Sequence, residues 1–184
     1  MKLKSALLTA GLLAAVPGLA LAQMSSDPMV GGSAMYPSKN IVQNAVNSKD
    51  HTTLVAAVKA AGLVPTLEGA GPFTVFAPTN EAFDALPSGT VPTLLKPANK
   101  PELTKVLEYH VVSGRYDTQA LMAMIAKGDG KAMLPTVAGP DLTFTQDGKT
   151  IDVTDAKGGT AQITIANVEQ SNGVIQVVNK VLLP

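Results

Sequence analysis

The sequence predicts an α+β fold in which most helices come first and most strands come last. In the first two thirds of the chain, apolar residues recur with helical spacing, as at Leu103, Val106 and Leu107. In the last third the spacing changes to two, as at Leu142 and Phe144, which is the period of a half-buried strand. Because helices and strands are segregated rather than alternating, we expect α+β architecture and not a doubly wound α/β sheet.

Length and composition restrict the class of protein. A chain of 184 residues allows one domain with short appendages, and 46% hydrophobic residues are enough for a core. The 14 Lys and Arg residues balance the 14 Asp and Glu residues, so no net positive charge favours nucleic-acid binding. The absence of Cys excludes disulfides, zinc–thiolate sites and a lipid-carrying cysteine. We therefore expect a monomer that does not bind nucleic acid.

The first residues have the pattern of a signal peptide. Lys2 and Lys4 form a positive segment, 6–16 is a short apolar run, and Ala20-Leu21-Ala22 is a small-x-small cleavage site. An uncleaved membrane anchor is the alternative, but Gly and Pro interrupt the run and it is short for a span. We predict a signal peptide over 1–22, export to the periplasm or the extracellular space, and no membrane span in the mature chain.

A leader and a first pair of helices are expected next. Residues 23–37 are rich in Ser, Gly, Pro and Met without a sustained period, which predicts a flexible leader. The folded domain is expected over 38–184. Ser38 can cap its first helix, and Gly62 can end the second. His51 lies at the junction of these helices, where a solvated or capping role is expected.

The stretch 71–83 combines a strand, a stop and a helix cap. Phe73 to Ala77 alternates as a largely buried strand, and Pro78 ends it because proline has no N–H for the ladder. Thr79 or Asn80 can then cap a short helix. No nucleophile, metal ligand or phosphate loop is present, so the stretch is interpreted as a folding nucleus.

Further elements follow in order. A helix is expected over 99–109, then a short strand that begins at His110, and then a helix from Asp117 or Thr118 to Gly128. Asp147-Gly148 and Asn172-Gly173 are turn signals between the later strands. Residues 181–183 are expected to close the chain after its last long strand.

Three blocks of sequence resemble one known family. Residues 74–83 (TVFAPTNEAF), Tyr109-His110-Val111-Val112 and the stretch 172–184 occur in the order and spacing of the fasciclin (FAS1) domain family. The resemblance covers 40–184 and is closest to small, single-domain secreted bacterial members. It implies one fasciclin domain, a twisted β-sandwich or wedge with packed α-helices.

The resemblance also implies a function. It suggests a non-catalytic adhesion or binding module that recognises a protein or glycan at a cell surface or in extracellular matrix. Tyr109, His110, Val111 and Val112 match the family's Tyr-His motif and are the binding residues it implies. Many members carry His and Asp where this chain has Gln176 and Asn179, which puts in doubt any role there that needs charge.

A catalytic interpretation centres on His110. A triad would need a nucleophile and a carboxylate, and Ser113 and Asp117 are close in sequence, but nothing in the sequence makes them converge. The alternative function is therefore a periplasmic small-ligand carrier or an enzyme with a His110 pocket. An exposed His110 beside a carboxylate would favour that alternative, and a buried His110 bonded to backbone would favour the binding module. A third possibility is a soluble envelope protein made under stress, with no fixed partner.

No cofactor or metal site is expected. The sequence contains no HExxH, GxSxG, Walker or GxGxxG motif. The four acidic residues Asp141, Asp147, Asp152 and Asp155 lie in separate strands and turns without calcium-loop spacing, so they are interpreted as solvated turn carboxylates. We expect no catalytic residue, no metal and no cofactor.

Overall fold

The computed structural model describes residues 27–184, and the predicted signal peptide with its cleavage site lies outside them. The predicted α+β fold is confirmed, with one late helix among the strands. The helices are α1 Ile41–Ala45, α2 Thr52–Ala61, α3 Val64–Glu68, α4 Asn80–Asp84, α5 Thr90–Leu94, α6 Lys100–Tyr109 and α7 Thr118–Lys127, with 3₁₀ turns at Lys49–His51 and Pro97–Asn99. The strands are β1 Met29–Val30, β2 Ser33–Ala34, β3 Phe73–Pro78, β4 Val111–Ser113, β5 Lys131–Pro135, β6 Asp141–Asp147, β7 Thr150–Thr154, β8 Thr160–Gln170 and β9 Gly173–Val178.

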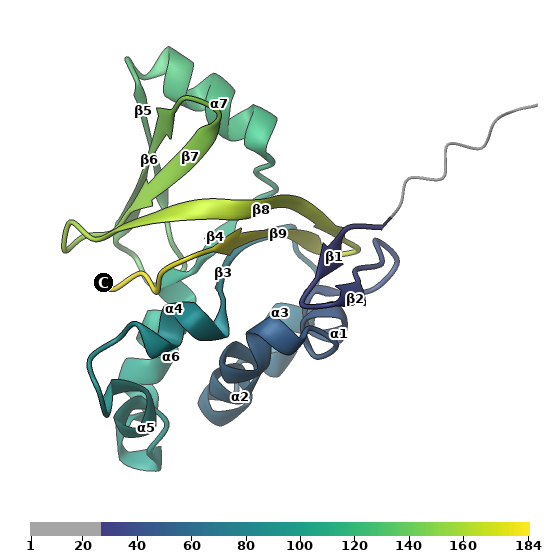
Figure 1. The fold of residues 1–184 in the computed structure, drawn as a ribbon, viewed down its shortest axis with the longest axis vertical. Helices are drawn as coiled ribbons and strands as arrows, with labels where there is room; N and C mark the ends of the chain where they lie inside the picture. Colours follow the sequence, from purple (N-terminus) through teal and green to yellow (C-terminus); the bar gives the residue numbers. More distant parts are fainter. Residues whose placement is uncertain (1–26) are drawn as a thin grey trace, which may run out of the picture.

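Seven strands form one sheet in the order β4-β3-β9-β8-β7-β6-β5. The β3–β9 pair is parallel and every other neighbouring pair is antiparallel. A single bridge between Val112 and Thr136 connects the two ends of this order, so the sheet nearly closes on itself. Figure 1 shows β8 and β9 crossing the middle of the molecule between two groups of elements.

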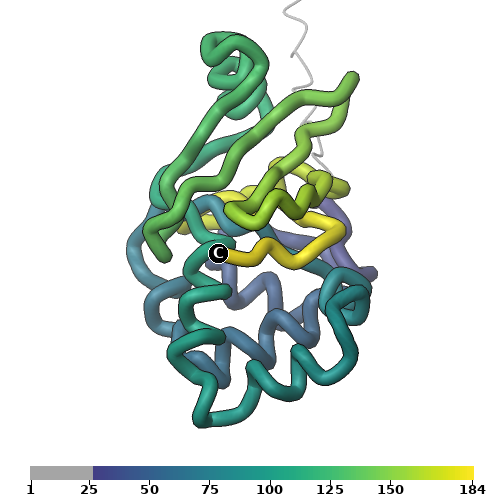
Figure 2. Tube along the Cα trace, turned by 90° about the vertical axis from the view of Figure 1, so that its left-hand side faces the viewer, coloured from purple at the N-terminus to yellow at the C-terminus, as the bar shows by residue number. Residues whose placement is uncertain are grey.

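The two groups lie on opposite sides of these central strands. Helices α1 to α6 gather below them, while α7 and the strands β5 to β7 stand above (Figures 1 and 2). Helix α7 packs against β5 and β6. The long β8 is bent where its register with β9 shifts between Ile163 and Ile165 and again before Val168, which is the effect expected of a bulge.

Strand β3 separates two hydrophobic cores. Its Val75 and Ala77 face the helix-side core, whose other members include Leu54, Leu107, Val168 and Ile175. Its Phe76 faces the sheet-side core, which also contains Tyr109, Val112, Leu121, Leu142, Phe144, Val153 and Leu182. Both faces of β3 are therefore buried, as the sequence predicted for this strand.

Most of the predicted helix ends are confirmed. The Thr79 hydroxyl accepts a hydrogen bond from the Ala82 N–H, and the Asp117 carboxylate accepts one from Ala120 N–H, so both residues cap the helices that follow them. Gly62 ends α2 in the left-handed region at φ 76°. For α1 the cap is Asn40 rather than Ser38, because Gln43 three residues later completes a capping box with Asn40.

Part of the predicted leader is ordered, which corrects the expectation of flexibility over 23–37. Strands β1 and β2 pair as a small hairpin around Gly31 and Gly32, which both have positive φ. Val30 and Met35 are buried in the core below it. The composition of this stretch suggested a loose segment, but two well-placed apolar side chains and a glycine turn are enough to attach it to the domain.

The last residues also differ from expectation. Residues 181–183 form no strand, although Val181 and Leu182 are buried. Their backbone is held by side chains instead of by a sheet neighbour: Leu182 N–H donates to His110, and Leu183 N–H donates to Asp155. Within the described residues, no helix has the length and apolar content needed to cross a bilayer.

Candidate functional site

The Tyr-His stretch connects the helical layer to the sheet. Helix α6 ends at Tyr109, and β4 begins at Val111 and pairs with β3 in antiparallel register. The Phe76 N–H donates to the His110 carbonyl over 2.8 Å, which continues that pairing to the end of the helix. The positions of these side chains are therefore set by α6 and by the pairing of β4 with β3.

Tyr109 is completely buried, and its hydroxyl connects two distant turns. It donates to the Asp141 carbonyl over 3.0 Å and accepts from the Ala156 N–H over 2.9 Å. Burial raises the pKa of this phenol, so it stays neutral. Both hydrogen-bonding functions of the hydroxyl are used within the protein, which leaves none for a partner.

His110 is also buried and fully hydrogen-bonded. Its Nδ1 lies 2.8 Å from the Val106 carbonyl, and its Nε2 accepts from the Leu182 N–H over 3.0 Å. Because a carbonyl can only accept and an amide N–H can only donate, the ring carries its single proton on Nδ1. Burial lowers the pKa of His110 to about 4, against the opposing effects of the Val106 carbonyl and Asp155. The neutral ring is therefore a structural connector between α6 and the C-terminal segment.

The two valines lie on opposite sides of β4. Val111 packs into the helix-side core and Val112 into the sheet-side core. All four residues of the predicted binding set are thus adjacent in space but buried. A partner would meet the surface that they support rather than the four side chains themselves.

The residues of the considered triad do not converge. Ser113 pairs with Phe73 at the far end of β4, and the Asp117 carboxylate is used as the cap of α7. Neither is a hydrogen-bond partner of His110. With both ring nitrogens of His110 occupied by backbone, the arrangement offers no group positioned to activate a nucleophile.

Asp155 differs from the solvated turn carboxylate that the sequence predicted. It is buried, and its two oxygens accept from the backbone N–H groups of Lys157, Gly159 and Leu183 over 2.7–3.0 Å. This carboxylate therefore organises the turn before β8 and holds the C-terminal segment. Within 27–184, no three His, Cys, Asp or Glu side chains are grouped to hold a metal ion.

Gln176 and Asn179, which stand where many members of the family carry His and Asp, both accept hydrogen bonds from β8. The Gln176 amide accepts from the Asn167 N–H over 2.9 Å and donates to the Tyr116 carbonyl over 3.1 Å. The Asn179 side chain accepts from the Gln162 N–H over 2.8 Å. Both departures thus have structural roles that need no charge.

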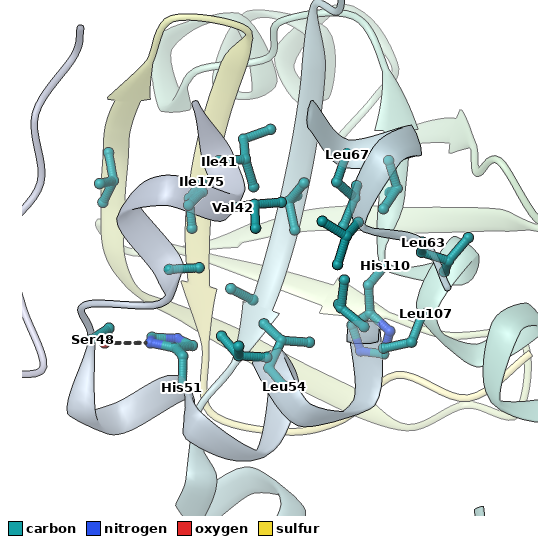
Figure 3. A pocket seen from close by; sticks show the side chains of 18 of the residues that line it. Ile41, Val42, Ser48, His51, Leu54, Leu63, Leu67, Leu107, His110 and Ile175 are labelled. Atoms are coloured by element: carbon teal, nitrogen blue, oxygen red, sulfur yellow. Dashed lines mark hydrogen bonds between the residues drawn. The ribbon is translucent and has the colours of Figure 1, made fainter. Parts of the chain in front are cut away.

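An apolar pocket lies between the helices and the sheet; the sequence suggested a pocket only as the alternative function at His110, and indicated neither its walls nor His51. Helices α1, α2 and α3 and the strands β3 and β9 supply its walls (Figure 3). His110 reaches it at one end and His51 at the other. His51 was expected to be solvated or capping, but only 3% of it is exposed and its side chain makes no cap bond. The only feature of the sequence that could have indicated the burial of His51 is its position just before the apolar residues of α2.

An exposed apolar row lies next to the β4 end of the Tyr-His stretch. From 131 to 137, exposed and buried side chains alternate. The exposed apolar ones are Met133, Pro135 and Val137. The Val137 N–H donates to the Val111 carbonyl over 2.8 Å, which joins this row to β4. Met133 is 60% exposed and Val137 43% exposed, so the row presents apolar surface to solvent. We call these three residues the β5 outer row.

A nearly closed sheet with a helical layer, connected by the buried Tyr-His stretch, defines a single α+β domain. The fasciclin domain family model matches residues 49–184, so the chain belongs to the fasciclin family. The fold and family that the sequence motifs indicated are therefore confirmed.

Three similar proteins illustrate the range of the family. The chain is 43% identical over 178 residues to Protein sll1483 of Synechocystis, covering 95% of this chain and 91% of that protein. It is 30% identical over 168 residues to the cell surface glycolipoprotein MPB83 of Mycobacterium bovis, covering 91% of this chain and 65% of that protein. The solved FAS1 domain pair of the insect cell adhesion molecule fasciclin I aligns with a TM-score of 0.69 at 17% identity, covering 79% of this chain and 51% of that one. That last likeness concerns the fold alone.

Proposed function

We propose that this protein is an exported, non-catalytic adhesion module that recognises a protein at a cell surface or in extracellular matrix. The observation that carries the proposal is the Tyr-His stretch, in which every polar function of Tyr109 and His110 is already used by the fold. Such a stretch can shape a surface but has no free group for chemistry. The name of a cell surface relative supports the same class of function.

The recognition surface in this proposal is the β5 outer row with the adjoining end of β4. Val111 and Val112 of the Tyr-His stretch fix its position, since the Val137 N–H donates to the Val111 carbonyl and Val112 forms a bridge with Thr136. Exposed apolar side chains at the core of an interface favour a protein partner, because they are desolvated on contact. A glycan, which would need exposed hydrogen-bonding groups, fits this row less well.

The alternative is a carrier or an enzyme that uses His110. His110 does line the apolar pocket, as that alternative requires. It is nevertheless buried, and the pocket wall beside it supplies no carboxylate. The binding module is therefore the better-supported proposal, and hydrolase screening of the wild-type protein is the matching control.

Binding to a panel of purified surface and matrix proteins, measured by surface plasmon resonance beside a glycan array, tests the proposal. Met133→Glu and Val137→Glu place a charge on the β5 outer row, and Val46→Glu changes an exposed valine on the helical side, 47% exposed. We expect the wild type and Val46→Glu to bind one panel protein equally and the two row variants to bind it at least about tenfold more weakly. Row variants that bind like the wild type, or binding to glycans alone, would contradict the proposed surface.

Export and a monomeric state belong to the same proposal. The residues around Ala22 have the pattern of a cleavage site, so protein recovered from envelope and culture fractions should begin at Gln23. N-terminal sequencing checks that start, and gel filtration of the same material checks the monomer. Recovered protein that still begins at Met1 would overturn the export proposal.

A further inference from the structure

We propose that the pocket between the helices and the sheet binds a small, unbranched apolar molecule that carries one hydrogen-bond acceptor, with that acceptor at His51. This site is separate from the β5 outer row and does not depend on the adhesion proposal. It rests on three observations: the chemistry of the pocket wall, the unpaired nitrogen of His51, and the contrast with His110 at the other end of the pocket.

The wall of the pocket is almost wholly apolar. Ile41, Leu54, Ala77 and Ile175 line it together with Val30 from the N-terminal hairpin. In Figure 3 the labelled aliphatic side chains, among them Ile41, Leu54 and Ile175, surround the pocket, with His51 on one side and His110 on the other. An apolar cavity with one or two placed polar groups is the usual composition of a small-molecule site.

His51 has a ring nitrogen without a hydrogen-bond partner. Ser48 Oγ lies 2.9 Å from its Nδ1, whereas the buried Nε2 has no partner among the described residues. The Ser48 hydroxyl can donate to Nδ1 or accept from it; we assign it as the donor, which places the single proton of the neutral ring on Nε2. Burial lowers the pKa of His51, which keeps the ring neutral; the nearby Ala77 carbonyl opposes this shift without completing a hydrogen bond. Nε2 is therefore an unused N–H donor at the end of an apolar pocket.

His110, the other histidine in the pocket, has no unpaired ring nitrogen, so the unpaired Nε2 is a feature of His51. Both histidines line the same pocket and both are buried. The nitrogens of His110 are both occupied by backbone, at 2.8 and 3.0 Å. A buried donor without an acceptor destabilises a protein, so a molecule that brings an acceptor to His51 recovers that loss on binding.

Few polar groups border this position. Ser48 lines the wall, but its hydroxyl is already hydrogen-bonded to His51 Nδ1, and most of the remaining wall is aliphatic. The cavity volume of about 50 Å³ is smaller than the roughly 150 Å³ that accepts benzene, so the present form suits a ligand of a few heavy atoms. Longer chains would require the β1–β2 hairpin, which contributes Val30 and Met35 to the wall, to move.

The test uses 2-butanone as the probe and 2-methyl-1-butene as its matched control, in which a CH₂ group replaces the carbonyl oxygen. Titration of the isotope-labelled protein is followed by NMR. We expect saturable shifts for 2-butanone, with a dissociation constant on the order of millimolar, at the amides of residues that line the pocket. The hydrocarbon should bind several-fold more weakly. This comparison needs no variant, so it remains decisive if a variant fails to fold.

Three variants locate the site. His51→Phe removes the donor and should weaken 2-butanone several-fold while leaving the hydrocarbon unchanged. His51→Gln keeps an N–H at similar reach and should retain most of the preference for the ketone. Ala77→Ile fills the cavity and should abolish binding of both probes. Absence of saturable binding up to the solubility limit, equal binding of ketone and hydrocarbon, or an unchanged ketone affinity in His51→Phe would each overturn the proposal.

Discussion

The two hydrophobic cores on either side of β3 are built differently. The sheet-side core contains large, completely buried side chains, and its Phe76 and Phe144 rings lie 5.3 Å apart at an interplanar angle of 41°. The helix-side core is mostly aliphatic, comes from several short helices, and contains the pocket. Aromatic rings from β3 and β6 meet and fill the space of one core, whereas short helices with aliphatic faces leave room in the other. The filled sheet-side core is therefore expected to contribute more to stability, and the helix-side core is the one with space for a small molecule.

The largest expected effect is on the sheet-side core. Phe76→Ala removes a ring that has no exposed surface and contacts Phe144, so we expect a loss of about 3–5 kcal/mol in the free energy of unfolding. For the comparison of packing, Leu142→Ala in this core and Leu54→Ala in the wall of the pocket remove the same atoms, and the second should cost less. Urea denaturation of all three variants measures these losses. Equal losses in the two Leu variants would mean that the cores do not differ in packing.

Acid should weaken the junction between the two cores through His110. Its pKa is lowered to about 4 in the folded protein from the ordinary value of 6.5, so the neutral ring stabilises the fold above pH 6.5. As pH falls from 6.5 toward 4, His110 becomes protonated in the unfolded chain but stays neutral in the folded protein, so about 3 kcal/mol of the free energy of unfolding is lost. Protonation also places a proton between Nε2 and the Leu182 N–H.

Urea midpoints measured from pH 7 to pH 4 check this expectation. His110→Gln should be less stable at pH 7 and should lose less stability on acidification. Because burial also lowers the pKa of His51, the His51→Phe variant serves as the second control. A His110→Gln protein with the same pH dependence as wild type would assign the acid sensitivity to other groups.

The smallest effect tests whether the N-terminal hairpin belongs to the helix-side core. Gly31 has a φ of +58°, and an added Cβ would lie 2.5 Å from Ser48 Oγ and 2.6 Å from Asp50 N. Gly31→Ala should therefore cost at least about 1–2 kcal/mol. In Gly32→Ala, with φ +75° and no atom within 4 Å of the added Cβ, only the backbone conformation is penalised. Thermal melts in which both variants equal wild type would show that the hairpin contributes nothing to stability.

The sequence predicted the elements whose signals are local. The alternation of Phe73 to Ala77, the cap at Asp117 and the left-handed Gly62 each depend on a few neighbouring residues, and all three are confirmed. The motif blocks also identified the family correctly. Local chemistry and a recurring pattern were sufficient for the architecture.

The parts that sequence could not predict depend on partners far along the chain. The bonds from His110 to Leu182 and from Asp155 to Leu183 connect residues that no periodicity relates. The ordered hairpin depends on Val30 and Met35 reaching a core formed by later helices. The unpaired Nε2 of His51 is likewise a property of the assembled pocket, because it is defined by what the surrounding side chains fail to offer.

The position of β9 has a consequence for how the chain assembles during synthesis. Residues 173–178 form the strand between β3 and β8, so the centre of the sheet is supplied by a segment made after all the other strands. Until that segment has left the ribosome, β3 lacks its parallel partner along its whole length, Phe73 to Pro78. Contacts that span about a hundred residues form slowly because a long loop must be closed first. The order of translation and the order of sheet completion therefore oppose each other, and a nascent chain stays open until its final strand is inserted.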